Sequence, residues 1–312
     1  MNLARSWKAW SLLGSAALVV GMVASPGASA LASESHPSVC TGTPTAPGVL
    51  AGDYEHGVII KGACEVNGGV ASVEGNLTVS RGSVLVAAFA LNDVKQKGKS
   101  RLLVWGNVYV QKGATMIAGC FPTSFPCIDD PSQSSPTLAM APFVKGSVVE
   151  SAPLGVVIHD AWISGSVTEV RGGGGVSCTP SGIFAAFQSP VYSDYEDSTI
   201  RGNLWISGLQ SCWLGIARVH VGRNATIWNN SMADPDAVEI ISNNIWGNLT
   251  CRKNVTSASA MVGNAGVWDS ADPTSNLFPR APLPNTVHGH RYGDCRLSSP
   301  LTPGGPLGPG KF

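Results

Sequence analysis

The chain has 312 residues, of which 44% are hydrophobic and only 13% are charged, against roughly 25% charged residues in an ordinary soluble domain. Twenty Lys and Arg residues balance twenty Asp and Glu residues, so the chain lacks the basic field that attracts a phosphate backbone. No nucleic-acid partner is expected. Thirty-seven glycines and 21 prolines accompany abundant aliphatic residues, and this composition favours many short strands joined by turns.

The N-terminus has the pattern of a secretory signal peptide. Arg5 and Lys8 precede an uncharged run at 12–24, which the small residues Ala28–Ala30 follow. The run is too short for the roughly 20 residues that span a bilayer. We therefore expect 1–30 to be cleaved and the mature protein to be secreted or associated with the cell envelope, without stable membrane insertion. The alternative is an uncleaved membrane anchor.

Eight cysteines fit an oxidising compartment, because an even count behind a signal peptide predicts disulfides. Eight cysteines allow 105 pairings, and the simplest joins neighbours along the chain: Cys40 with Cys64, Cys120 with Cys127, Cys178 with Cys212, and Cys251 with Cys295. The histidines do not alternate with the cysteines at zinc-binding spacing. No metal and no cofactor is expected.

A five-residue repeat, [VI]-x-G-[NS]-[LV], organises the chain. Its six copies centre on glycines 75, 106, 146, 165, 202 and 247, and degenerate copies surround Gly62 and Gly289. Aliphatic residues on both sides have strand spacing, and Gly and Asn tolerate the positive φ of a sharp bend. Each copy therefore predicts a strand, a corner and a second strand. Separations of 19 to 45 residues correspond to one or two turns of about 20 residues, the size of a coil in a parallel β-helix.

These patterns predict an all-β chain. After the signal peptide we expect an N-terminal extension at 31–50, a right-handed parallel β-helix at 51–297 with loop insertions at 120–142 and 173–198, and a Pro/Gly-rich tail at 298–312. An antiparallel β-sandwich with recurring turns is the alternative fold, although a sandwich does not need the same residue classes at every corner.

The C-terminal third carries a resemblance to a known group of proteins. The segment Asn248–Asn254, with Cys251 inside it, is followed by a V-x-G segment at 287–289 and by Cys295. Together with the tandem corners at 51–297, this pattern resembles exported bacterial right-handed β-helix proteins, most of which have no assigned activity. The resemblance implies fold and export rather than a reaction.

Glu150 and Glu169 are the candidates for catalysis. They occupy one repeat position 19 residues apart, so stacked strands would hold their carboxyl groups about 4.8 Å apart, near the ~5–5.5 Å of a retaining glycosidase pair. The adjacent Val149 and Val170 favour a different arrangement, in which the valines face inward and both glutamates point to water. We expect the second arrangement.

Aromatic residues flank the corner glycines and are the candidates for binding. Trp105 and Trp246 precede a glycine, whereas Tyr109 and Trp205 follow one at the outward parity. Outward aromatics on a rigid solenoid are suitable platforms for sugar rings. The alternative is that the loop insertions fold over them.

The sequence favours a non-enzymatic extracellular or envelope protein that binds or supports a polysaccharide of the cell wall or its surroundings. A carbohydrate-active enzyme, either a polysaccharide lyase or a glycoside hydrolase, is the first alternative and rests on fold analogy. A self-assembling, bactofilin-like filament is the second. The oligomeric state is not predicted.

Overall fold

The computed structural model describes residues 36–88, 100–119, 142–234, 238–241, 243–256, 267–268, 285–293 and 295. Pro37–Phe312 forms one unit, distinct from Met1–His36. The predicted signal peptide, the tail at 298–312 and the insertion expected at 120–142, apart from Pro142, therefore lie outside the described residues.

Within the described residues the chain is almost entirely β-structure, and every pairing between its named strands is parallel. The strands form three stacks, which we call ladders 1, 2 and 3. Ladder 1 contains β1 (Ser38–Gly42), β4 (Leu77–Val79), β7 (Val108–Val110), β10 (Val148–Ser151), β13 (Val167–Val170), β16 (Leu204–Ser207), β20 (Ala225–Trp228), β24 (Leu249–Arg252) and β27 (Arg291–Gly293). Ladder 2 contains β2 (Gly48–Tyr54), β5 (Val84–Ala88), β8 (Thr115–Gly119), β11 (Gly155–His159), β14 (Tyr192–Glu196), β18 (Trp213–Ala217), β22 (Val238–Ile241) and β25 (Val267–Trp268).

Ladder 3 consists of short strands: β6 (Arg101–Val104), β9 (Phe143–Val144), β12 (Trp162–Ile163), β15 (Thr199–Ile200), β19 (His220–Val221), β23 (Asn244–Ile245) and β26 (Thr286–Val287). The long β3 (Val58–Val73) pairs with β4, β5 and β6 in turn and so passes through all three ladders. A separate pair, β17 (Gln210–Ser211) with β21 (Ser231–Met232), and one short helix, α1 (Gly182–Ala186), complete the described elements.

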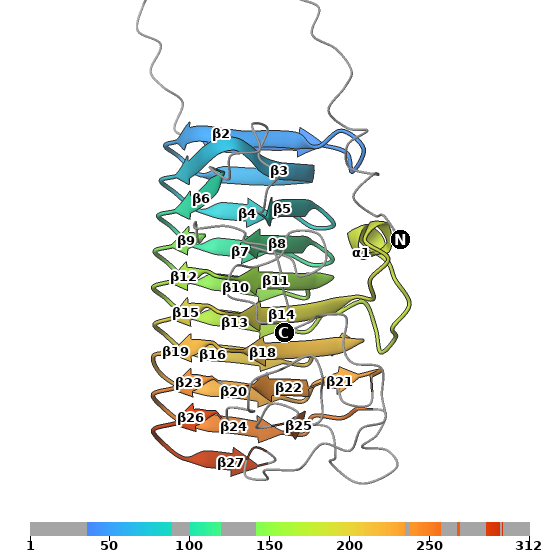
Figure 1. The fold of residues 1–312 in the computed structure, drawn as a ribbon. Coiled ribbons are helices and arrows are strands. Elements are labelled where there is room, and N and C mark those ends of the chain that lie inside the picture. Colours follow the sequence, from blue (N-terminus) through green and yellow to red (C-terminus); the bar gives the residue numbers. More distant parts are fainter. Residues whose placement is uncertain are drawn as a thin grey trace, which may run out of the picture. The chain divides into compact units, whose positions relative to one another are not determined.

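The chain visits the ladders in a constant order, and we call one such passage a rung. From β9 it passes to β10 in ladder 1, then β11 in ladder 2, and reaches ladder 3 again at β12. Figure 1 shows the rungs stacked in sequence order, from β2 to β27. This arrangement is compatible with a parallel β-helix. The antiparallel sandwich alternative is wrong, because the strands of successive rungs pair in parallel.

The core lies inside the rungs and is built by alternation of side chains along short strands. In β4 and β7, for example, Leu77, Val79, Val108 and Val110 are buried, while the residues between them are partly exposed. Neighbouring strands keep these residues in register, so like side chains stack into apolar columns that run through the rungs. One rung alone could not bury this surface.

The corner glycines are required for space rather than for an unusual backbone angle. None of the glycines at 75, 106, 146, 165, 202 and 247 has positive φ, so the predicted reason for them is wrong. A Cβ on Gly106 would lie 2.5 Å from the carbonyl oxygen of Gly75, and one on Gly146 would lie 2.5 Å from that of Gly106. Backbones of adjacent rungs thus meet at a distance that only glycine permits.

The Asn or Ser after each glycine joins the rungs by hydrogen bonds. The backbone N–H of Asn107 donates to Asn76 Oδ1 at 2.8 Å, and that of Ser147 donates to Asn107 Oδ1 at 2.8 Å. The same bond continues through Ser166, Asn203, Asn224, Asn248 and His290. Each side chain satisfies an N–H group that the bend leaves without a strand partner.

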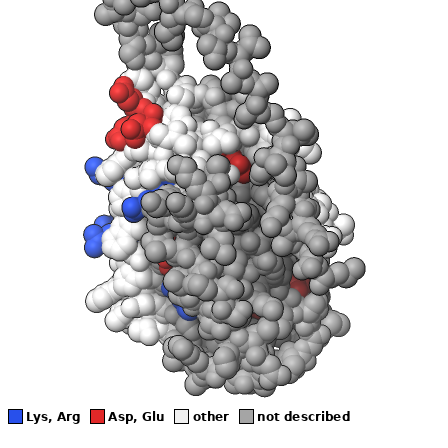
Figure 2. All heavy atoms as spheres, turned by 45° about the horizontal axis from the view of Figure 1, so that its top comes forward, with Lys and Arg blue, Asp and Glu red and all other residues white. Residues whose placement is uncertain are grey.

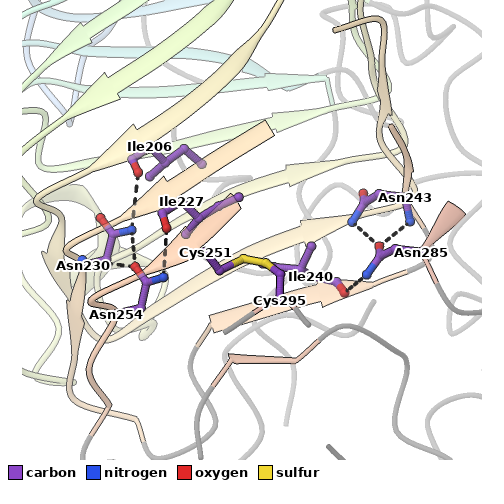
Figure 3. The surroundings of a disulfide bond; sticks show 9 residues. All are labelled: Ile206, Ile227, Asn230, Ile240, Asn243, Cys251, Asn254, Asn285 and Cys295. Atoms are coloured by element: carbon purple, nitrogen blue, oxygen red, sulfur yellow. Dashed lines mark hydrogen bonds between the residues drawn. A yellow bond between two sulfur atoms is a disulfide. The ribbon is translucent and has the colours of Figure 1, made fainter. Parts of the chain in front are cut away.

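Two buried asparagine pairs perform the same task at the other corners. Asn254 Oδ1 accepts from Asn230 Nδ2 at 2.9 Å, and Asn285 Oδ1 accepts from Asn243 Nδ2 at 2.9 Å. Figure 3 shows both pairs on either side of the disulfide between Cys251 and Cys295.

The described residues contain three disulfides, which join Cys40 with Cys64, Cys178 with Cys212, and Cys251 with Cys295. These pairings agree with the neighbour pattern expected from the sequence. Cys120 and Cys127 lie outside the described residues. The first bridge involves β1 of the first described rung, and the last joins Cys251 of β24 to Cys295, which follows β27 of the last described rung.

Candidate functional sites

Glu150 and Glu169 lie in the interior of the rungs. They occupy β10 and β13 in direct register, and their exposed fractions are 1% and 0%. The expectation that both point to water is wrong, because Glu150 shares the buried face of Val148 while Val149 is 37% exposed. The two carboxyl groups are therefore stacked on adjacent rungs.

Two side chains of β14 reach the stacked carboxyl groups from across the interior. Tyr195 Oη lies 2.5 Å from Glu150 Oε2 and 3.0 Å from Glu169 Oε2, and Ser193 Oγ donates to Glu169 Oε1 at 2.7 Å. A phenol has one proton, so Tyr195 donates to one carboxylate only. Its contact with the other glutamate becomes a hydrogen bond when that carboxyl group is itself protonated.

Burial controls the charge of this pair. Burial, with the charge of Glu169 as a second cause, raises the pKa of Glu150 well above its ordinary value. Burial also raises the pKa of Glu169 to about 7, despite the hydrogen bonds from Ser193 and Tyr195. Desolvation outweighs these bonds because an ionised carboxylate loses its water. Burial therefore favours the protonated form of the Glu150 carboxyl group.

The expected stacking of the two glutamates is thus present, but it lies in a closed core. A retaining glycosidase needs a sugar ring between its two carboxyl groups, and neither glutamate contacts solvent. The geometry instead makes Glu150, Glu169 and Tyr195 a polar link between neighbouring rungs.

An open aromatic surface occurs on the outer face of ladder 1. Trp205 of β16 and Trp228 of β20 project from adjacent rungs with exposed fractions of 39% and 37%, and their ring centroids are 6.4 Å apart at an interplanar angle of 33°. Trp205 Nε1 donates to Ser207 Oγ at 2.8 Å, which fixes the ring in place. The two rings form a tilted shelf.

This shelf is one wall of a shallow groove of about 440 Å³, which we call the Trp205–Trp228 groove. Its lining includes Arg171, Asn229 and Lys253, which stand at the corner between ladders 1 and 2. All three have positive φ, from 55° to 64°, which costs a residue with a Cβ about 1–2 kcal/mol. Ala152 and Gly208, at the equivalent corner of other rungs, also have positive φ, so this backbone angle belongs to the corner itself. The groove thus combines two aromatic faces with two cations.

Trp105 and Trp246 lie elsewhere, beside the glycine corner between ladders 3 and 1, and are 41% and 56% exposed. Trp105 packs edge-on against Phe143 with centroids 5.4 Å apart, and Lys145 Nζ lies 5.7 Å from the centre of its ring. Trp246 stacks on His288 at 4.4 Å. Both tryptophans thus have protein neighbours on part of their surface.

The structure separates the four predicted aromatic residues into two groups. Tyr109 lies on the outer face of ladder 1 and is half-buried, three rungs from Trp205 along the pairing Tyr109, Val149, Thr168, Trp205. Only Trp205 lines the groove.

Sequence reasoning missed Trp228 and Trp162, because neither occupies a position next to a corner glycine. Trp162 is 40% exposed, and the guanidinium of Arg201 lies 5.2 Å from its ring centre. Trp228 follows the buried Ile227 directly. Extending the alternation of β20 by one residue would have placed it outside.

Charged side chains are sparse on the described surface in Figure 2. Lys and Arg form a few separate groups along one edge, and Asp and Glu gather above them. This distribution agrees with the low charged fraction of the chain. No broad field of one sign covers the described part of the face drawn in Figure 2.

Comparison of the chain with protein-family models, with curated proteins and with solved structures finds no match. Among the described residues, no helix has the length and apolar character needed to cross a membrane. The three disulfides among the described residues are compatible with an extracellular protein.

Proposed function

We propose that the chain is an exported polysaccharide-binding protein, built on a right-handed parallel β-helix, which holds its ligand in the Trp205–Trp228 groove. The observation that carries the proposal is the pair of fixed, exposed indole faces on adjacent rungs. Exposed aromatic side chains beside a groove mark interaction sites, and a flat indole face fits the apolar face of a sugar ring.

The shape of the groove favours a polymer over a small molecule. The groove is shallow and open, whereas small-molecule sites enclose most of the ligand. The outer face of a stack of rungs continues beyond the groove in both directions, as solenoid surfaces for extended ligands do. A chain of sugars can therefore enter and leave the groove along the ladder.

The charges favour an acidic polysaccharide. Arg171 and Lys253 supply two cations, and the described residues that line the groove include no acidic one. An Arg guanidinium pairs with carboxylate or sulfate groups in a bidentate manner. Uronic acid or sulfated sugars would satisfy both cations while stacking on the indole rings.

Export and fold rest on independent support. The N-terminal pattern at 1–30 is that of a signal peptide, and the three disulfides suit an oxidising compartment. The constant order of the ladders supports a β-helix, and parallel β-crossovers are almost always right-handed.

The test is a panel of neutral and acidic polysaccharides in affinity electrophoresis with the purified mature protein, accompanied by an assay for reducing ends and unsaturated products. We expect retardation by acidic polymers, weakened retardation of an Arg171→Gln, Lys253→Gln variant, and no product. Arg81→Gln, which changes a cation outside the groove, is the matched control. Retardation by no polymer, or release of product, would overturn the proposal.

A further inference from the structure

A second cluster of polar side chains lies on the outer face of ladder 2. It contains His159 at the end of β11 and Asp194 and Glu196 of β14. Ser193 bonds Glu169 and Tyr195 bonds Glu150 in the interior, so the alternating Asp194 and Glu196 point away from it.

All three side chains are nevertheless buried, with exposed fractions of 0%. Part of their cover comes from aromatic packing on the same outer face, where Phe184 of α1 meets Tyr192 edge-on with ring centroids 5.3 Å apart. Buried ionisable groups in such a position need compensation by charge, by hydrogen bonds or by a bound ion.

The two carboxylates converge on a single ring nitrogen. His159 Nε2 lies 2.8 Å from Asp194 Oδ2 and 3.9 Å from Glu196 Oε2. A proton on Nε2 is donated to Asp194 Oδ2 only, because 3.9 Å is too long for a hydrogen bond to Glu196. The three atoms lie within 4.8 Å of one another. Ligands of one tetrahedral zinc ion, each at about 2.0–2.2 Å from the metal, are roughly 3.3 Å apart.

A second observation singles out the Asp194 carboxylate. Its Oδ1 is buried and has no hydrogen-bond partner in the described part of the chain. Space for it is provided by Gly215, its register partner in β18, where an added Cβ would lie 2.5 Å from Oδ1. Gly215 does not have positive φ, so glycine is needed here because it leaves space for the Asp194 carboxylate.

Glu196 is oriented from its other side. Arg218 Nη2 lies 3.3 Å from Glu196 Oε2, and the same guanidinium makes two shorter bonds to Asp197, at 2.5 and 2.6 Å. Such outer partners hold a ligating carboxylate in place.

We propose that His159, Asp194 and Glu196 form a buried binding site for a zinc ion that ties adjacent rungs together. One imidazole and two carboxylates suit this ion, and three protein ligands leave one coordination position for water. Binding requires Nε2 to be unprotonated, with the ring proton on Nδ1. Sequence spacing did not reveal the site, because the histidine and the carboxylates come from different rungs. The site is independent of polysaccharide binding.

The experiment is zinc analysis of the full mature protein, produced in zinc-containing medium and dialysed against metal-free buffer. We expect one zinc ion per chain, and a Tm that falls by several degrees on exhaustive chelation and recovers when zinc is returned. Asp194→Asn should lose the zinc while retaining the circular dichroism of the wild type. His288→Gln, which removes an exposed histidine, should retain it.

Wild-type protein without zinc, and with the same Tm in zinc and in chelator, would overturn the proposal and identify the trio as an ordinary buried ion pair. A folded Asp194→Asn variant that keeps stoichiometric zinc would also overturn it. The wild-type measurements decide the matter even if the variant does not fold.

Discussion

At the scale of single residues, the two buried glutamates form a structural link in the core rather than a reactive pair. Glu150 and Glu169 stack in register on adjacent rungs, yet the core holds them without solvent and Tyr195 bridges them. An interior carboxyl group is stable in its neutral form, because the ionised form loses hydration that one phenol cannot replace. The folded state therefore binds a proton more tightly than the unfolded state.

The first prediction concerns pH. The folded pKa of Glu169, about 7, exceeds the ordinary 4.5, so between these values the folded state holds a proton that the unfolded state has lost. The free energy of unfolding then falls as the pH rises from 4.5 to 7, by on the order of 3 kcal/mol from this group. Glu169→Gln, neutral at every pH, should raise Tm at pH 8 and change it little at pH 4.5.

Thermal unfolding of both proteins across this pH range measures the effect. Glu55→Gln, at an exposed side chain, is the control and should leave the pH profile of the wild type unchanged. A Glu169→Gln variant that is less stable than the wild type at pH 8 would contradict the assignment of a proton to this pair.

The second prediction concerns the glycine corners. A Cβ at residue 165 would meet the Gly146 carbonyl oxygen at 2.5 Å, and backbone rather than a flexible side chain must shift. Gly165→Ala should cost roughly 2–3 kcal/mol, toward the upper end of what overpacking costs. Gly82→Ala, at an open turn with φ of 69°, should cost about 1 kcal/mol for the backbone alone. Equal losses in urea unfolding would contradict the close-approach explanation.

At the scale of elements, side-chain ladders at the corners hold the short strands in register. A ladder 3 strand of two residues offers few backbone bonds of its own, so bonds from Asn and Ser on neighbouring rungs complete the pairing. Among these corner side chains, the buried asparagines depend most on having all their hydrogen bonds made. Asn243 accepts from Val219 N–H and donates to Ile216 O, each at 2.8 Å, and also donates to Asn285.

The third prediction follows from burial. Asn243→Ala would leave several buried groups unpaired, at roughly 1–3 kcal/mol each, whereas Asn224→Ala, at the exposed corner, leaves groups that water can reach. We expect the first variant to lose at least about 2 kcal/mol in urea unfolding and the second about 1 kcal/mol or less. A smaller loss for Asn243→Ala than for Asn224→Ala would contradict the role of the buried ladder.

Much of this element-level organisation could be predicted from the sequence, because the corner motif recurs and its strands alternate. The physical role of the motif could not. Glycine and asparagine combine conformational freedom with small size, so the sequence does not show which property the corner requires. The register of adjacent rungs shows that glycine is needed for close contact between backbones and asparagine for hydrogen bonding. Likewise, an isolated strand does not show whether Val149 or Glu150 faces the core. The register shows it, because Glu150 pairs with the buried Val110 and Glu169 pairs with the buried Ile206.

At the scale of the whole molecule, each rung contacts chiefly its neighbours, so the ends of the stack are its weakest parts. The bridge between Cys251 and Cys295 spans 44 residues and ties the last described rung to β24. A loop of this length corresponds to on the order of 4 kcal/mol by chain entropy. This disulfide therefore opposes fraying at the C-terminal end of the stack.

The fourth prediction is that Cys251→Ser with Cys295→Ser loosens this end alone. Hydrogen–deuterium exchange should accelerate in β24, β26 and β27, while β10 to β18 keep their protection, because repeat units unfold locally. Replacing Cys178 and Cys212 instead provides the matched control, with change confined to the central rungs. Uniform acceleration in the first variant would contradict the local account.

The aromatic surface belongs to the same scale, since it exists only where rungs stack. Trp205 and Trp228 are close both in sequence and in space. They form a shelf only because β16 and β20 are in register. Binding should therefore depend on both rings together and not on exposed tryptophans in general.

The most direct test of this account compares the retardation of two variants by the acidic polysaccharide that binds the wild type. Trp205→Ala with Trp228→Ala should weaken binding at least about tenfold, equivalent to ~1.4 kcal/mol. Trp162→Ala, which removes a tryptophan of similar exposure on ladder 3, should bind as the wild type does. Undiminished binding by the double variant, or an equal loss in Trp162→Ala, would contradict the placement of the ligand in the Trp205–Trp228 groove.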